Sequence, residues 1–253
     1  MSLAPSAALD ALVGAHRART TLVRFTDTHP DLDAAWGRRV QDLDRATRQA
    51  LGDVAVGAKL GLTSEAKQRT MGVHEPIVGF LTAGMDLAAG ADLAALVQPR
   101  VEPEVAFVLA RDLSGPVARI ELPSYVASVA AALEVLDSRY TGYSFRLPDV
   151  LADNTSAAAF LLGEPVPLPD DLAARPARWL VDDVEVAATS PAAILGDPLL
   201  ALAHLAADLG QRREVLPAGS VVLAGAMTDA VPLEQGSRFT VDVAGLPPLT
   251  LVR

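Results

Sequence analysis

The 253-residue sequence contains no cysteine, which excludes disulfide bonds, thiolate metal sites and a cysteine nucleophile. It also lacks an apolar run of about 18 residues and a basic start followed by an apolar segment, so we expect no transmembrane helix and no signal peptide. No Lys/Arg cluster is longer than a pair and the formal net charge is −10, which argues against a nucleic-acid or anionic-membrane partner. We therefore expect a soluble, cytoplasmic protein.

Lysine is scarce as well, since only Lys59 and Lys67 stand among 21 basic residues. Lys67 lies in the polar stretch SEAKQR, which is typical of the solvated start of a helix, so we predict that it is a surface residue. Lys59 interrupts the apolar stretch VAVGAKLGLTS between Gly57 and Gly61, where the backbone can approach a ligand closely. A desolvated lysine can lose its proton whereas arginine in effect cannot, so Lys59 is a candidate catalytic residue. The structural alternative is that Lys59 only pairs with a buried acid.

The hydrophobic pattern changes from helical to strand-like along the chain. Helical spacing covers residues 5–22 and 31–51, and Asp31 or Asp33 can cap the second helix. Short apolar runs separated by glycine and proline predict strands at 54–60, 100–110, 131–137, 158–162, 178–187, 220–225, 238–243 and 248–252. The stretches PSYVASVAAALE and GDPLLALAHLAADLG predict two more helices. The fold class is therefore α+β, with a helical cap at residues 1–52 on a β body at 53–253, together one continuous structural unit.

Three carboxylates fall in stretches that otherwise look buried. If RVEPEVAFVL is a strand, Glu102 and Glu104 share one of its two largely apolar faces, and Glu134 stands among apolar residues in AALEVLDSRY. Buried like charges are costly unless a cation neutralises them. Acids without histidine or cysteine partners favour a hard ion, Mg²⁺ or Mn²⁺. A solvated or salt-bridged pair of glutamates is the alternative, while zinc is disfavoured because the histidines show no paired ligand spacing.

Four segments in order resemble the hydratase/decarboxylase family of meta-cleavage catabolism, which has the fumarylacetoacetase-like fold. They are GAKLGLTSEAKQRTMGVHEPIVGFLTAGM, PRVEPEVAFVLARDL, ALEVLDSRYTGYSFRLPDVLADNTSAAAFLLG and VVLAGAMTDAVPLEQGSRFTVDVAGL. The resemblance implies a mixed β-roll body, a catalytic-site lysine at Lys59, and a divalent metal held by Glu102, Glu104 and Glu134. It also implies that three further residues lie near the pocket, although hydrogen bonds in the turn DNTS are an alternative explanation for them: Asp137, Asn154 and Ser156.

The same resemblance leaves two reactions open, both on small 2-oxo or 2-hydroxy acids that can chelate a metal. One is decarboxylation of 4-oxalocrotonate (2-oxohex-3-enedioate), which mainly needs an electron sink. The other is hydration of 2-hydroxypenta-2,4-dienoate, which needs further acid-base groups. Hydratases of this family tend to carry aspartate after the proline of VHEPIVGF, and here Ile77 occupies that position. We therefore predict a decarboxylase with Ile77 at the substrate, while Glu75 could still reach the pocket and serve a hydratase.

Three more distant alternatives remain open on the sequence alone. Lys59 could form a Schiff base without a metal, or the chain could hydrolyse a C–C bond of an acylpyruvate. A non-catalytic partner subunit of a hydratase is disfavoured, because a scaffold has no use for a charged interior. The resemblance also implies a homo-oligomer and association with a homologous hydratase.

Overall fold

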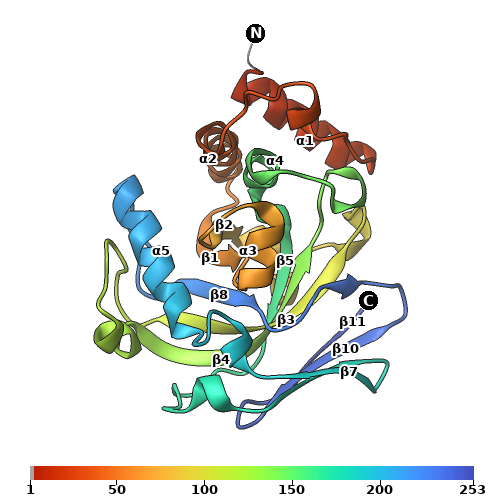
Figure 1. Cartoon of the computed structure of the whole chain (residues 1–253). Coiled ribbons are helices and arrows are strands. Elements are labelled where there is room, and N and C mark those ends of the chain that lie inside the picture. The colour runs from red at the N-terminus through yellow and green to blue at the C-terminus, as the bar shows by residue number, and fades with distance from the viewer. Residues whose placement is uncertain (1–2) are drawn as a thin grey trace.

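The computed structural model describes residues 3–253, including every side chain in that range except those of Glu65 and Thr70. The α-helices lie mainly at the amino-terminal end of the molecule and beside the sheets (Figure 1). They are α1 (Pro5–Ala18), α2 (Ala34–Ala50), α3 (Glu65–Met71), α4 (Leu147–Ala152) and α5 (Leu199–Arg212). The strands are β1 (Ala55–Gly61), β2 (Ile77–Thr82), β3 (Arg100–Leu109), β4 (Val126–Leu136), β5 (Ala157–Leu162), β6 (Ala177–Val181), β7 (Val184–Thr189), β8 (Val221–Ala226), β9 (Val231–Pro232), β10 (Arg238–Val243) and β11 (Leu249–Val252).

Within residues 3–253 the strands form two sheets. The larger has the order β2-β1-β8-β3-β4-β5 with β9 beside β3, and its β1–β8 pair is parallel while its other pairs are antiparallel. The smaller sheet, β11-β10-β6-β7, lies across the larger one at the bottom of Figure 1. Side chains of both sheets share one apolar core, in which the rings of Trp179 and Phe239 stack with centroids 6.2 Å apart. The predicted α+β class, a mixed β-roll with helices at its amino-terminal end, is confirmed.

Strand β4 replaces the helix that the alanine-rich stretch at residues 123–134 predicts. The high helix propensity of alanine is a weak preference that tertiary packing overrides. Here Ala130, Ala131 and Ala132 lie between β3 and β5 with at most 3% of their surface exposed. Strand β4 is paired on both edges, with β3 and β5, and the alanine side chains on its faces are buried. Small side chains fit such a covered position.

Two other strand predictions need correction. The single run at residues 178–187 is a hairpin of β6 and β7, and its turn contains Asp182 and Asp183 with φ values of 51° and 64°. Aspartate tolerates this left-handed conformation better than most residues, which suits a tight two-residue turn. Strand β2, which carries Ile77, was not predicted at all, and it pairs with β1 along its whole length.

A short turn, Asn154–Ser156, joins the two ends of the larger sheet and closes it into a roll. Asn154 precedes β5, yet its side chain bonds to β2: the amide of Phe80 donates to Asn154 Oδ1 at 3.0 Å, and Asn154 Nδ2 donates to the carbonyl of Phe80 at 2.9 Å. Gly79 permits this approach, since a Cβ there would lie 2.3 Å from Thr155 Oγ1. One buried side chain thus substitutes for a pair of backbone hydrogen bonds between β2 and β5.

Replacing this asparagine should therefore destabilise the whole fold. In Asn154→Ala the buried N–H and C=O of Phe80 lose their partners, and each such group costs about 1–3 kcal/mol. We expect a loss of about 2–5 kcal/mol in the free energy of unfolding, measured by urea denaturation. Gln49→Ala, at an exposed position of α2, is the control and should change stability by less than about 0.5 kcal/mol. Equal stability of the two variants would contradict the closing role.

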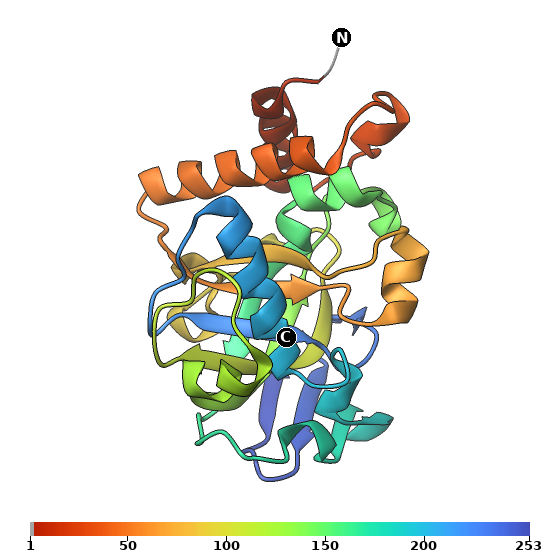
Figure 2. The same ribbon diagram turned by 60° about the vertical axis from the view of Figure 1, so that its left-hand side comes forward.

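The amino-terminal helices are tied to the roll by polar contacts. Asp33 caps α2 by accepting from the amide of Trp36 at 2.7 Å, as one of the two predicted capping residues. Along α2, Gln41 Nε2 donates to Asn154 Oδ1 at 3.0 Å, and Arg45 Nη2 lies 2.6 Å from Glu214 Oε1 beyond α5. Figure 2 shows α2 crossing over the roll with α1 above it. The division into a cap at 1–52 and a body at 53–253 stays a prediction.

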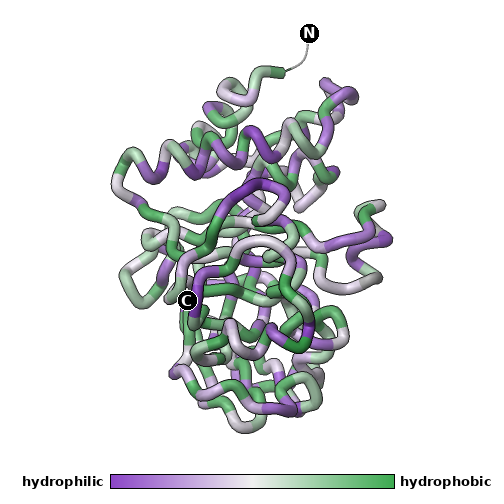
Figure 3. Tube along the Cα trace, turned by 90° about the vertical axis from the view of Figure 1, so that its left-hand side faces the viewer, coloured by the Kyte–Doolittle hydropathy of each residue, from purple (hydrophilic) through white to green (hydrophobic). Residues whose placement is uncertain are grey.

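The hydropathy of the chain follows this arrangement. In Figure 3 apolar segments concentrate in the sheets, whereas polar and apolar turns alternate along α1 and α2. In the described part of the chain, no helix combines the length and the apolar character needed to cross a membrane.

Candidate active site

The three carboxylates singled out in the sequence meet at one point between β3 and β4. Glu102 lies directly opposite Glu134 in the antiparallel pair, and Glu104 follows two residues later on the same face of β3. One carboxylate oxygen from each residue lies within 4.8 Å of the others, and at most 8% of any of these residues is exposed. Like charges directly opposite each other destabilise a sheet, so this arrangement requires a compensating cation.

The donor set fits a hard divalent cation. Among the described residues, Glu104 Oε1 and Glu134 Oε2 are buried and have no hydrogen-bond partner. Burial raises the pKa of Glu104 well above its usual value, and the charges of Glu134 and Glu102 raise it further. Burial also raises the pKa of Glu134, although Lys59 opposes this. Buried oxygens without donors, held close together by the backbone, are what Mg²⁺ or Mn²⁺ uses as ligands.

Lys59 reaches this cluster from β1. Its Nζ lies 3.0 Å from Glu134 Oε1, and only 3% of its side chain is exposed. The strand positions Lys59 between Gly79 of β2 and Leu223 of β8, so its backbone is held on both sides. A buried ammonium beside three carboxylates and next to a pocket is placed to stabilise, or to give a proton to, an oxygen of a bound molecule.

A cavity of about 110 Å³ opens beside these groups. Lys59 and Glu102 line it, together with several apolar side chains, among them Leu62, Ile77, Leu136, Phe145 and Val150. The ring of Tyr143 completes the wall, fixed because its hydroxyl donates to the carbonyl of Leu136 at 3.0 Å. Ile77 lines this cavity, and its contact with a substrate stays a prediction, while Glu75 is exposed and is not one of the lining residues.

The turn that closes the roll also supplies the pocket with hydroxyl groups. Thr155 and Ser156 line the cavity, and in the described structure Thr155 Oγ1 and Ser156 Oγ are buried without a hydrogen-bond partner. Three successive residues of this turn have left-handed backbone angles, with φ of 43° at Asn154, 54° at Thr155 and 61° at Ser156. Non-glycine residues rarely adopt this conformation, and it persists only where the surroundings impose it. Thr155 was not predicted as a site residue, although it lies within the DNTS motif.

Lys67 corrects a prediction, because it belongs to the pocket rather than to the open surface. From α3 its Nζ donates to Glu102 Oε1 at 3.1 Å, and its side chain is only 31% exposed. Burial lowers the pKa of Lys67, but the charge of Glu102 and the hydrogen bond to it outweigh this, so the pKa is raised overall. The local sequence is polar, and no local signal shows that α3 folds back toward β3.

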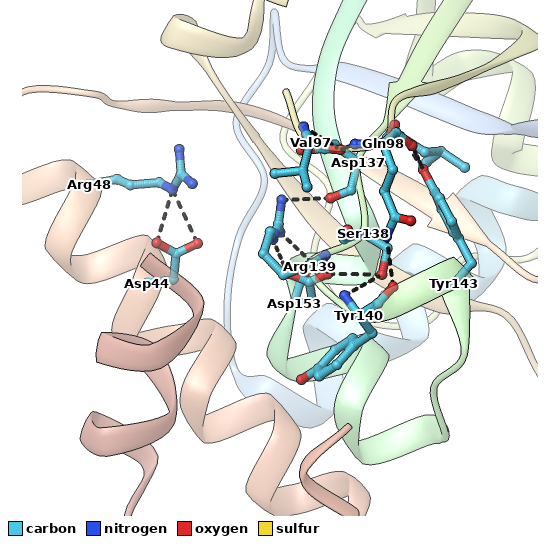
Figure 4. Close-up of polar contacts among 11 residues, drawn as sticks. Asp44, Arg48, Val97, Gln98, Asp137, Ser138, Arg139, Tyr140, Tyr143 and Asp153 are labelled. Carbon is cyan, nitrogen blue, oxygen red and sulfur yellow. Dashed lines mark hydrogen bonds and ion pairs between the residues drawn. The ribbon is translucent and has the colours of Figure 1, made fainter. Parts of the chain in front are cut away.

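Two other predicted residues have their side chains turned to the backbone instead of the pocket. Asp137 accepts from the amides of Val97 and Gln98, the latter at 2.7 Å, and Asn154 holds β2 as described above. Figure 4 shows Asp137 among these partners, close to Arg139. The structural alternative, hydrogen bonds within turns, therefore accounts for the side chains of both residues.

A larger cavity of about 440 Å³ lies between α1, α2 and β5. Charged residues line it, and four of them form two pairs: Arg48 Nε contacts Asp44 Oδ1 at 3.0 Å, and Arg139 pairs with Asp153 (Figure 4). The three clustered glutamates and Lys59 are not part of its lining. The smaller cavity is thus the candidate active site.

Comparison with known proteins identifies the family of the chain. No protein-family model matches the chain. It is 40% identical over 223 residues to 4-oxalocrotonate decarboxylase of Pseudomonas sp, covering 86% of this chain and 87% of that protein. It is also 40% identical over 232 residues to 2-keto-4-pentenoate hydratase of Burkholderia vietnamiensis (strain G4 / LMG 22486), covering 89% and 88%. The solved 4-oxalocrotonate decarboxylase from Pseudomonas putida G7, complexed with magnesium and adipate, superposes with a TM-score of 0.91 at 31% identity, covering 98% of this chain and 96% of that one.

The fold is that of the fumarylacetoacetate hydrolase structural class. A member of that class from Yersinia pestis CO92 shares the fold alone, with 12% identity and a TM-score of 0.58 over 79% of this chain and 93% of that one. Within the class, the chain belongs to the hydratase/decarboxylase family of 4-oxalocrotonate decarboxylases and 2-keto-4-pentenoate hydratases, which are lyases.

Proposed function

We propose that the chain is a divalent-metal-dependent decarboxylase that converts 4-oxalocrotonate into 2-hydroxypenta-2,4-dienoate and CO₂. The observation that carries the proposal is the composition of the pocket, in which Ile77 and other apolar side chains line the same cavity as Glu102 and Lys59. A hydratase needs a group that delivers water and protonates carbon at the wall that these side chains form, and an isoleucine side chain can do neither. Similarity to relatives named as decarboxylases supports the same reaction.

The proposed metal ligands are Glu102, Glu104 and Glu134. Mg²⁺ or Mn²⁺ bound there supplies a Lewis acid for the 2-oxo end of the substrate. A substrate whose 2-oxo acid end faces the carboxylates directs its other end along the apolar wall, past Ile77. Adipate, which is bound in the related decarboxylase structure, is likewise a six-carbon dicarboxylate.

The reaction breaks the C5–C6 bond. Its electron pair moves through the C3=C4 double bond to the oxygen on C2, and C6 leaves as CO₂. Lys59 stabilises the negative charge that develops on the 2-oxygen and provides the proton that this oxygen takes up. The hydroxyls of Thr155 and Ser156, which have no partner in the described structure, hold the substrate in place. The apolar wall strips water from the departing carboxylate, which favours neutral CO₂ over the charged ground state.

The proposal is tested by giving the purified protein, with Mg²⁺, each of the two substrates in turn. We expect CO₂ release from 4-oxalocrotonate, followed by the ultraviolet absorbance of the substrate and by trapping of CO₂. Efficient hydration of 2-hydroxypenta-2,4-dienoate with no turnover of 4-oxalocrotonate would show that the decarboxylase assignment is wrong and that the chain is a hydratase.

The apolar wall makes a prediction of its own. Ile77→Asp should slow decarboxylation by about tenfold or more, because a polar group beside the departing carboxylate keeps it hydrated and repels it. Ile77→Leu, which keeps the apolar character and the volume, should change kcat by less than about threefold. Steady-state kinetics and thermal unfolding of both variants distinguish this effect from a role of Ile77 in core packing alone. If Ile77 only packs the core, the substitutions should change the unfolding temperature and leave the kcat of both variants equal to that of the wild type.

On the basis of the family resemblance, we also propose that the chain forms a homo-oligomer and that this oligomer binds a homologous hydratase. Such a complex would pass the product to the enzyme that adds water to it. Light scattering of the purified protein tests the first part, and a monomer at micromolar concentration would contradict it.

A further inference from the structure

Both lysines of the chain line the candidate active site, although the other 19 of its 21 basic residues are arginine. The function proposed above uses Lys59 and leaves Lys67 without a role. Lys67 Nζ lies 3.1 Å from Glu102 Oε1, 3.3 Å from the carbonyl oxygen of Thr228 and 3.8 Å from Asp229 Oδ1. Its firmest partner is therefore one of the proposed metal ligands.

Binding of a divalent cation by Glu102 weakens this contact. A dication and an ammonium group on one carboxylate repel each other strongly at such short range. The side chain of Asp229 is 96% exposed, so it offers Lys67 only a weak pair that solvent screens. Lys67 is one of the residues that line the pocket, so a lysine displaced from Glu102 remains beside it.

We propose that Lys67 is the counter-ion of Glu102 until the metal binds, and that it then holds the 1-carboxylate of the 2-oxo acid substrate. The second half of the inference rests on the proposed function. Lys67 contacts the carboxylate cluster itself, so it serves the substrate end that faces the metal and not the end along the apolar wall. The substrate carries two carboxylates, and a cation at one end determines which of them is retained and which is lost.

Such an anchor acts on binding more than on chemistry. The charge of the 1-carboxylate is the same before and after C5–C6 cleavage, so an ion pair with it stabilises the bound substrate and the transition state about equally. Loss of Lys67 should raise KM at least about tenfold and leave kcat within about threefold of the wild-type value. This pattern separates Lys67 from Lys59, whose loss should lower kcat.

Metal binding tests the first half directly, without turnover. We expect Lys67→Met to bind Mn²⁺ several-fold more tightly than the wild type in calorimetric titrations with the metal alone, because the competing ammonium is gone. Lys67→Arg should stay near the wild type. Arg178→Met is the matched control, since it removes one positive charge from an exposed pair with Asp242 in the smaller sheet and should not change Mn²⁺ affinity. Equal or weaker Mn²⁺ binding by Lys67→Met overturns the counter-ion role.

Two probes test the second half on the Mn²⁺-loaded protein. 2-Oxohexanoate has only the metal-facing carboxylate, whereas 2-oxoadipate has the same end and a second carboxylate. Lys67→Met should weaken both by the same factor, about tenfold or more, and Lys67→Arg should restore most of the loss. Weakening of 2-oxoadipate alone would assign Lys67 to the departing carboxylate and overturn the proposal, as would wild-type binding of both probes. These are binding measurements, so they remain decisive even if the decarboxylation assay fails.

Discussion

Glu104→Gln should abolish catalysis while leaving a fold at least as stable as that of the metal-free wild type. The substitution removes one charge from three converging carboxylates, so we expect at least about a thousandfold loss of kcat and a large loss of Mg²⁺ or Mn²⁺ affinity. The glutamine oxygen can still accept from the amide of Gly225, which donates to Glu104 Oε2 at 2.8 Å. Because burial and neighbouring charges raise the pKa of Glu104, its ionised form costs stability that glutamine does not.

Three measurements on Glu104→Gln check this expectation: steady-state kinetics, calorimetric metal titration and thermal unfolding without metal. Glu164→Gln, which makes the same change at an exposed position, is the control and should behave as the wild type. Full activity of the wild-type protein after exhaustive chelation would refute the metal site. A large drop in the unfolding temperature of metal-free Glu104→Gln would instead show that the carboxylate is structural.

The second large effect is expected at Lys59. Lys59→Met should lower kcat by about two to four orders of magnitude, because the 2-oxygen loses both the ammonium charge and its proton donor. Metal affinity should not fall and should rise by several-fold at most, since Lys59 contacts Glu134 as a positive charge and is not itself a proposed ligand. Methionine fills a similar volume, and Glu134 can take up a proton in its buried position, which keeps the fold intact. Kinetics and metal titration together check this separation of effects.

Borohydride treatment distinguishes this role from a covalent one. We expect no adduct at Lys59 after reduction in the presence of substrate, because its buried Nζ is held in an ion pair 3.0 Å from Glu134 Oε1. Peptide mapping by mass spectrometry gives the answer. A reduced substrate adduct on Lys59 would establish the Schiff-base alternative.

The clustering of the three glutamates could be predicted in part, because a simple local rule governs it. Alternation along a strand fixes Glu102 and Glu104 on one face, and apolar neighbours imply that they are buried. The position of Glu134 opposite Glu102 follows from the register of β3 and β4, which the sequence does not contain but which the resemblance implied. Lys59 was marked by its chemistry, as a lysine in an apolar strand.

The errors occur where long-range contacts decide. Lys67 looks solvated because its neighbours along the chain are polar, and only the packing of α3 near Glu102 reveals its role. Asp137 and Asn154 are polar residues in turns, which can serve a ligand or the backbone, and the sequence does not tell these uses apart. The first part of β4 was taken for a helix, although a strand was predicted at 131–137, because alanine carries little information about the sheet that surrounds it.

The closing turn at Asn154–Ser156 has a consequence for the order of folding. Strands β3 and β4 are neighbours in sequence and pair with each other, so a partly folded chain can already assemble the three glutamates and take up a cation. The hydroxyls of Thr155 and Ser156 reach the pocket only after Asn154 has joined β5 to β2, which are far apart in sequence. During refolding, metal uptake should therefore precede the return of activity, and the interval between them measures how long the roll takes to close.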